Sequence, residues 1–148
     1  MPILKIETGQ NNPILREKSQ TIEKIDENIL NLAKDMIETM TKKDGVGLAA
    51  PQIGKNIRLF VVHPTLSKKT VFINPEISKI SKQTDVTEEG CLSLPNIFVP
   101  VKRAKSIKIK ALDENGEEFK SKTKDLLARV IQHEIDHLNG ILIIDKYE

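Results

Sequence analysis

Two of the three histidines in this chain, His133 and His137, lie four residues apart, and Glu134 directly follows the first. On a helix, residues i and i+4 share one face, so two imidazoles at this spacing can bind one metal ion. Glu134 would then lie close enough to contact a water molecule bound to that ion. The H-E-x-x-H pattern therefore predicts metal-assisted hydrolysis, and the alternative is a charged helix face with two solvated histidines.

The identity of a third metal ligand is the next question. A catalytic zinc-type site uses three protein ligands and keeps one position open for water. Few residues follow His137, and Asp145 comes directly after an apolar run, so we expect the third ligand to lie upstream. The upstream candidates are Cys91, His63, Glu88 and Glu89. Of these, Cys91 can supply a thiolate, a strong ligand for zinc or ferrous iron, whereas His63 is predicted to be a surface histidine.

A second candidate segment, residues 45–54, contains three glycines and includes the sequence Ala-Ala-Pro-Gln-Ile-Gly. It does not end in Gly-Lys-Ser/Thr, so it is not a phosphate-binding loop. Glycines allow backbone to approach another group closely. The segment therefore predicts packing against an extended peptide, with Gln52 as a polar contact, and a purely structural tight loop is the alternative.

Two long helices and several short strands must position these residues. Apolar residues at spacings of three and four predict a helix from about Glu27 to Lys42, with Asp26 as its N-cap. A second helix is predicted to begin at Lys124 or Asp125, to run through the interior and to end before Gly140. Strands are predicted at 58–62, 70–73, 76–80, 96–101 (interrupted by Pro100), 106–112, 117–123 and 141–144, with a hairpin turn at 113–116.

These elements predict an α+β fold in which mixed, mainly antiparallel β-sheets surround a central metal-binding helix, with a second long helix in the N-terminal part. We expect residues 1–148 to form a single domain, because this length is typical of a chain with one core. The net charge of +2 argues against nucleic acid and membrane partners. One cysteine cannot form an internal disulfide, which suits a cytoplasmic location.

Three segments together resemble the signature motifs of the peptide deformylases. They are Gly45-Val46-Gly47-Leu48-Ala49-Ala50-Pro51-Gln52, Glu89-Gly90-Cys91-Leu92-Ser93 and Gln132-His133-Glu134-Ile135-Asp136-His137. Their order and spacing match as well. The resemblance implies a metal-dependent hydrolase that removes the N-formyl group from formyl-methionine at the N-terminus of nascent polypeptides and releases formate.

The resemblance also implies roles for individual residues. Cys91, His133 and His137 would bind one divalent metal ion, natively Fe²⁺, with Zn²⁺, Ni²⁺ or Co²⁺ able to substitute. Glu134 would act as general base and acid. The Gln52 amide and the Leu92 backbone N–H would donate to the oxyanion. The substrate-binding positions would be Val46, Gly47, Gly90, Leu126, Arg129 and Val130. Asp136 is expected to be structural, paired with Arg103.

The chain departs from bacterial members of that family at Asn96, where many have glycine, and after its last motif. Those members continue after the last motif into a long C-terminal helix that is implicated in ribosome docking, whereas this sequence stops at Glu148. The resemblance is therefore to a short form, for which ribosome association is in doubt and a monomer is expected. A zinc peptidase that cuts internal bonds and a non-enzymatic domain with a structural metal are the competing hypotheses.

Overall fold

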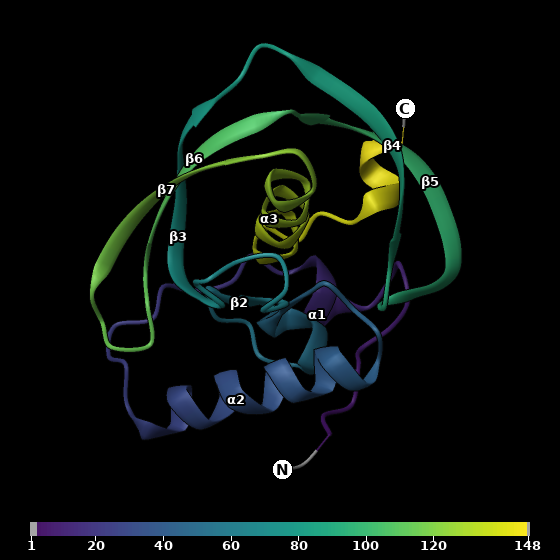
Figure 1. Ribbon diagram of the computed structural model, residues 1–148. Helices are drawn as coiled ribbons and strands as arrows, with labels where there is room; N and C mark the ends of the chain where they lie inside the picture. Colours follow the sequence, from purple (N-terminus) through teal and green to yellow (C-terminus); the bar gives the residue numbers. More distant parts are fainter. Residues whose placement is uncertain (1–2, 148) are drawn as a thin grey trace.

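The helix that carries both candidate histidines lies in the middle of the molecule, with strands around it on several sides (Figure 1). In this computed structural model, which describes residues 3–147, that helix is α3 (Asp125–Leu138). Ile131, near its middle, is completely buried, as expected for a helix that is apolar on more than one side. Gly140 follows the end of the helix and has a φ of 74°, a conformation that favours glycine. A Cβ at this position would also lie 2.3 Å from the Arg16 backbone oxygen, so only glycine fits.

One side of α3 packs against a five-stranded antiparallel sheet with the strand order β1-β2-β3-β6-β7. The strands are β1 (Gly47–Ala49), β2 (Leu59–Val62), β3 (Val71–Ile80), β6 (Ser106–Leu112) and β7 (Glu118–Lys124). Phe60 and Phe72 stack on the inner face of this sheet, with ring centroids 4.7 Å apart, and belong to the same core as Val130 and Ile131 of α3. Burial of apolar surface, at about 25 cal/mol per Å², is the main contribution that holds α3 in place.

A two-stranded antiparallel ribbon passes along another side of α3 (Figure 1). It consists of β4 (Thr84–Cys91) and β5 (Leu94–Ala104). Leu94 and Val101 of β5 form a smaller core with Leu15 and Leu142. The candidate cysteine thus stands at the end of β4, where this ribbon turns.

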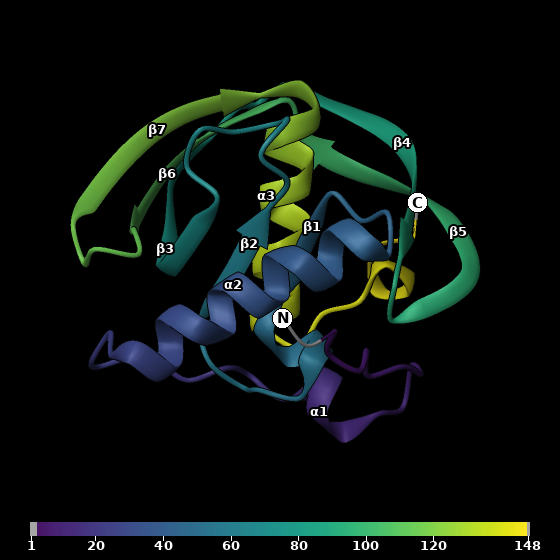
Figure 2. The same ribbon diagram turned by 60° about the horizontal axis from the view of Figure 1, so that its bottom comes forward.

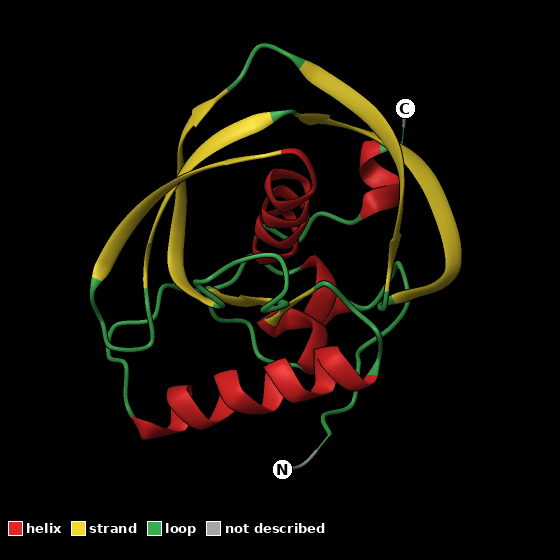
Figure 3. Ribbon diagram, viewed as in Figure 1, coloured by secondary structure: helices red, strands yellow, loops and turns green. Residues whose placement is uncertain are grey.

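The second long helix, α2 (Glu27–Lys42), crosses the sheet on the side away from α3 (Figure 2). Its buried Met36 and Met40 share a core with Leu59 and Val61 of β2. The remaining helical segments are short: α1 (Pro13–Arg16) and the 3₁₀ turns η1 (Ala50–Ile53) and η2 (Ile143–Lys146), and strands and loops make up most of the rest (Figure 3). Among residues 3–147, no helix is sufficiently long and apolar to cross a membrane.

The α+β prediction and both long helices are confirmed. The Asp26 side chain accepts a hydrogen bond from the Ile29 N–H at 3.0 Å and so caps α2, as the sequence predicts. The hairpin turn is also confirmed, because Gly116 has a φ of 77° and the Asp113 carboxylate accepts hydrogen bonds from Asn115 N and Glu117 N.

Three strand predictions need correction, and one strand was not predicted. Pro75 does not separate two strands, because β3 continues past it. The strand accommodates the proline through a register irregularity between Ile73 and Glu76, where Asn74 has a φ of 49°. Pro100 does not interrupt β5, because a two-stranded ribbon has free edges that need no donor at that position.

The missed strand comprises residues 84–91, and the third correction concerns residues 141–144. Residues 84–91 form β4, which the sequence did not reveal because most of its side chains are exposed and show no apolar alternation. The prediction of a strand at residues 141–144 is wrong, because the chain from Ile143 forms η2. The Asp145 carboxylate accepts a hydrogen bond from the Leu142 N–H at 2.9 Å, which favours a local turn.

Candidate active site

Three potential metal ligands from two distant segments converge on one point. The donor atoms of Cys91, His133 and His137 all lie within 4.8 Å of one another. The His137 Nε2 is 3.3 Å from the Cys91 Sγ and 3.2 Å from the His133 Nε2. Tetrahedral bonds of about 2.0–2.3 Å place ligand atoms roughly 3.3–3.6 Å apart, so these residues fit one divalent ion of the zinc type.

The fold brings these ligands together by two means. The i, i+4 spacing on α3 places the two imidazole rings 4.9 Å apart, as the sequence predicts. Cys91 lies two residues after the buried Glu89 on β4, and alternate residues of a strand share one face, so the thiol is on the side of the helix. Of the upstream candidates, Cys91 is therefore the one that meets the histidines. Glu88 is exposed, and His63 lies in a separate turn where its Nδ1 contacts Thr65.

The orientation of His133 depends on Glu89, which is not itself one of the three converging ligands. The Glu89 Oε1 lies 3.0 Å from the His133 Nδ1, which leaves the Nε2 directed at the metal position. A carboxylate that holds a metal-binding histidine in this way fixes both the ring and its tautomer. Burial alone would raise the pKa of Glu89, but hydrogen bonds from His133 and Arg103 lower it to about 2, so the carboxylate is charged.

Two arginines complete a buried ion cluster around Glu89. Arg103 donates to both Glu89 oxygens at 3.0 Å and pairs with Asp136, which confirms the predicted Arg103–Asp136 contact. Arg129 pairs with Glu89 as well as with Asp85. We call Glu89, Arg103, Arg129, Asp136 and His133 the buried ion cluster. Each of its charges has a partner inside the protein, as burial requires.

The charge balance at the donors fits a cation. Burial alone would lower the pKa of His133, but the hydrogen bond with Cys91 and the charge of Glu134 raise it to about 10. The surrounding groups therefore favour a positive charge at this position. The pKa of His137 is held well below its usual value by burial and by His133, so its ring is neutral, which is the form that binds metals.

Glu134 lies beside the three ligands, with 4% of its surface exposed. Burial raises the pKa of its carboxyl group to about 7. Its Oε1 has no hydrogen-bond partner among the described residues, which is unusual for a buried carboxylate oxygen and is typical of a group that acts on a ligand. A Cβ on Gly47 would lie 2.7 Å from the Glu134 Oε2, so β1 can pass this carboxylate only with glycine at that position.

The glycine-containing segment approaches the metal position through Gln52. Its Oε1 accepts a hydrogen bond from the Ala49 N–H at 3.0 Å, which fixes the amide. Its Nε2 then lies 3.5 Å from the Cys91 Sγ and 3.1 Å from the Ser93 Oγ. The amide donor is thus held beside the candidate ligands, and Leu92 directly follows the cysteine.

The expected substrate-binding residues fall into two groups. Val46, Leu126 and Gly90 are exposed, while Val130 is buried and would lie 2.9 Å from a Cβ on Gly47. Val130 of α3 and Gly47 of β1 therefore lie next to each other beside the Glu134 carboxylate.

The Arg129 guanidinium, which the resemblance assigns to substrate binding, is held inside the protein. Arg129 is only 8% exposed and its guanidinium bonds to Glu89, to Asp85 and to the Val101 carbonyl. A buried Glu89 needs paired cations, and this need draws the arginine inward.

Sequence reasoning missed the part that Glu89 plays around the ligands. It considered Glu89 only as a possible ligand, and Arg103 only as a partner for Asp136. One available signal was that Glu89 lies two residues before Cys91, because alternate residues of a strand share one face. That signal required β4 to be recognised as a strand.

The chain is similar to proteins of known type over nearly its whole length. The family model for polypeptide deformylase matches residues 3–148. The peptide deformylase of Pseudothermotoga lettingae is 48% identical over 134 residues, which cover 90% of this chain and 77% of that relative. The Dictyoglomus thermophilum enzyme is 52% identical over 135 residues, covering 91% and 87%. The crystal structure of Thermotoga maritima peptide deformylase superposes with a TM-score of 0.95 at 44% identity, covering 100% of this chain and 99% of that one.

Proposed function

We propose the residues that form the active site of this chain, which belongs to the peptide deformylase family, enzymes that remove N-formyl groups from nascent peptides. They are Cys91, His133, His137 and Glu134. The observation that carries this proposal is the convergence of one thiol and two imidazoles beside a buried carboxylate. A structural metal site would be closed by a fourth protein ligand. Glu134 adjoins these three ligands as a group suited to proton transfer instead.

The family is metal-dependent, and the three ligands would hold one divalent ion, for which we propose Fe²⁺ as the native metal. Zinc, nickel and cobalt suit the same set of one sulfur and two nitrogens. When bound, such an ion lowers the pKa of water toward neutrality and polarises a carbonyl oxygen.

Glu134 then acts as the proton carrier of the reaction. Its carboxylate takes a proton from the water that attacks the formyl carbon. As the C–N bond breaks, Glu134 returns that proton to the departing amine nitrogen. Water and the formyl peptide thereby become formate and a free N-terminal amine. The location of Glu134 beside Gly47 supports this role, because the substrate backbone can approach the carboxylate along β1.

Two donors stabilise the formyl oxygen as it gains negative charge. We assign these roles to the Gln52 Nε2 and the Leu92 backbone N–H. The fixed position of the Gln52 amide, held by the Ala49 N–H, supports this assignment because a donor that is already oriented requires no reorganisation during the reaction.

The peptide binds as an added strand between β1 and the end of β4, next to Gly47 and Gly90. The methionine side chain would enter a pocket formed by Val46, Leu126 and Val130. The exposure of Val46 and Leu126, at 47% and 53%, supports this assignment, because large apolar side chains on a surface often mark a binding site.

The direct experiment measures formate release from formyl-Met-Ala-Ser by anaerobically purified protein loaded with Fe²⁺ or Ni²⁺. We expect turnover with either metal and none with acetyl-Met-Ala-Ser. Protein that binds one metal ion per chain but releases no formate would refute the proposal. Cleavage of internal peptide bonds by the same preparation would favour a peptidase.

A further inference from the structure

Lysines gather on the outer surface of the sheet, the face opposite to the one that packs against α3. Lys108 of β6 lies directly opposite Lys79 of β3 on one side and Lys122 of β7 on the other. Directly opposite residues of antiparallel strands point to the same face, so these three lysines form a row across three strands. All three are exposed.

Further lysines extend this row along β7. Lys120 and Lys124 lie two residues on either side of Lys122, and alternate residues of a strand share a face. Lys105 stands at the corner before β6. We call the exposed lysines 79, 105, 108, 120, 122 and 124 the lysine face. Within the part of the chain that the structure describes, none of them has a carboxylate in ion-pair range, whereas the neighbouring Lys110 pairs with Glu76 at 3.5 Å and Glu118 at 3.9 Å.

Edge protection does not explain this arrangement. Lysines on an exposed edge strand prevent pairing with other chains, and β7 is the last strand of its sheet. That function would account for lysines on β7 alone. Lys79 and Lys108 lie on β3 and β6, which have neighbours on both sides, and like charges placed opposite one another destabilise a sheet. Their concentration in a chain whose net charge is only +2 therefore indicates a ligand of opposite charge.

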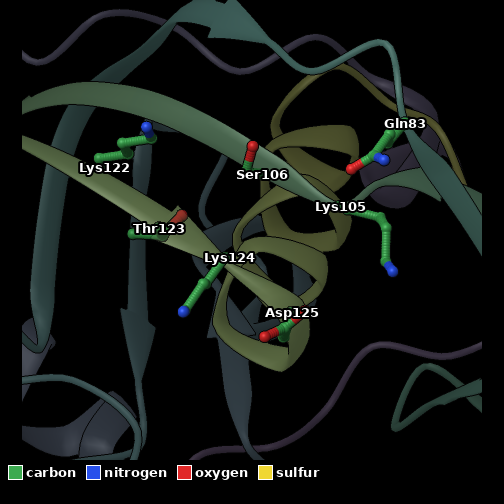
Figure 4. A pocket seen from close by; sticks show the side chains of 7 residues that line it. All are labelled: Gln83, Lys105, Ser106, Lys122, Thr123, Lys124 and Asp125. Atoms are coloured by element: carbon green, nitrogen blue, oxygen red, sulfur yellow. The ribbon is translucent and has the colours of Figure 1, made fainter.

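The shape of the face favours an extended ligand over a single small anion. An open hollow of about 550 Å³ lies at one end of it, lined by Gln83, Lys105, Ser106, Lys122, Thr123, Lys124 and Asp125. Figure 4 shows that the ammonium groups of Lys105, Lys122 and Lys124 lie apart rather than around one point, and that the Asp125 carboxylate is also present. One phosphate could not contact all three lysines, whereas a chain of phosphates could.

We propose that the lysine face binds the phosphate backbone of structured RNA. The choice of RNA rests on the proposed function, because the substrates are nascent peptides, which are made on an RNA-containing particle. The face ends at Lys124, next to Leu126 at the proposed substrate pocket, so RNA bound there would lie beside the entrance to the active site. A membrane surface is a less suitable ligand. Elements that bind a membrane surface insert several large apolar side chains, whereas Ile80 is the exposed large apolar residue beside Lys79 on β3.

The expectation of no nucleic-acid partner came from net charge alone. Net charge does not describe how charges are distributed, and contacts with phosphates depend on local lysine density. The fold places lysines from three separate strands on one surface.

The test measures binding of the full-length, metal-loaded chain to a fluorescein-labelled RNA hairpin by anisotropy, from 50 to 200 mM KCl. The variant Lys79→Gln/Lys108→Gln/Lys122→Gln removes the row. The matched control, Lys24→Gln/Lys34→Gln/Lys43→Gln, removes three exposed lysines elsewhere and has the same net charge. We expect the row variant to bind about tenfold or more weakly at 100 mM KCl, with the slope of log K against log salt reduced by about three. The control should bind as the unmodified chain does.

Three results would overturn the proposal. They are an equal loss in both triple variants, no binding of the hairpin at 50 mM KCl, and tighter binding to a DNA duplex of the same sequence or to phosphatidylserine vesicles than to RNA. Formate release from a free formyl peptide should be unchanged in both triple variants. Because binding is measured without substrate, a chain that binds RNA but releases no formate contradicts only the proposed function, and an active chain that does not bind RNA contradicts only this inference.

Discussion

The buried ion cluster and the lysine face treat charge in opposite ways. Around Glu89, two arginines, a histidine and Asp136 are largely shielded from water and each has a partner of opposite charge. On β3, β6 and β7, lysines of one sign face solvent and oppose one another. The first arrangement positions a metal ligand through contacts inside the protein, and the second leaves charge available to something outside it.

This difference indicates how charge relates to function in this protein. A paired charge in the interior makes its neighbours rigid, because moving it would leave an ion unpaired in a medium of low dielectric. An unpaired charge at the surface costs little in water and can be neutralised by a ligand. Removing a charge should therefore destabilise the first region and slightly stabilise the second.

The largest expected effect tests whether the interior region serves catalysis. Glu134→Gln keeps the shape of the side chain but cannot carry a proton, so formate release should fall by about 10²–10⁴-fold. Metal content, measured by plasma emission spectroscopy, should stay at the unmodified level, because Glu134 is not a ligand. A fall of less than tenfold would show that Glu134 is not the general base.

The second prediction breaks the buried ion cluster itself. Glu89→Gln leaves Arg103 and Arg129 without their shared carboxylate, and we expect urea unfolding of the metal-free protein to show a loss of about 3–5 kcal/mol. Metal affinity should also fall by about 10–100-fold, because His133 loses the group that orients it.

The neighbouring residue offers a matched control for this prediction. Glu88 is exposed, so Glu88→Gln removes the same charge one position earlier and should change stability by no more than about 0.5 kcal/mol. Equal effects of the two substitutions would mean that the cluster contributes nothing specific.

The third prediction concerns an ion pair outside both regions. The Lys69 Nζ donates to the Asp113 carboxylate at 2.9 Å, and this hydrogen bond, with those from backbone N–H groups, lowers the pKa of Asp113 below its ordinary value of 3.8. A lowered pKa contributes stability that is present above pH 3.8 and is lost as pH falls through the folded-state value. Urea midpoints should therefore fall less between pH 6 and pH 3 for Asp113→Asn than for the unmodified chain. The same dependence in both proteins would contradict this assignment.

The smallest effect tests the lysine face without any ligand. Lys122→Glu replaces a repulsive cross-strand pair with an attractive one opposite Lys108. We expect a gain in unfolding free energy of about 0.2–1 kcal/mol at low salt, which should shrink as salt is added. A loss of stability would mean that Lys122 makes a favourable contact in the folded protein, and the contrast between the two regions would weaken.

Much of the active site was predictable because its chemistry is local in sequence. His133, Glu134 and His137 are fixed by helical spacing, and helix α3 has clear apolar and glycine signals at its ends. The choice of Cys91 among four upstream candidates needed a three-dimensional contact or a family resemblance. Spacing alone did not reveal it, because Cys91 reaches the histidines only when β4 forms and packs beside α3.

The parts that sequence did not predict depend on pairing between distant strands. Nothing in the local pattern of residues 84–91 indicates β4, so the place of Glu89 in the cluster was not visible. The row of Lys79, Lys108 and Lys122 exists only in the register of β3, β6 and β7. The buried contacts of Arg129 were not predictable either, because its position in the chain says nothing about a carboxylate forty residues away.

The single cysteine gives this protein an internal reporter. Cys91 is the only thiol in the chain and is also one of the three converging ligands. Titration with a coloured disulfide reagent on native protein therefore counts the centres whose sulfur is uncoordinated, and titration after unfolding in chelator counts all of them. The ratio of the two measures the loaded fraction of any preparation without a substrate, so specific activities from different metals can be placed on one scale.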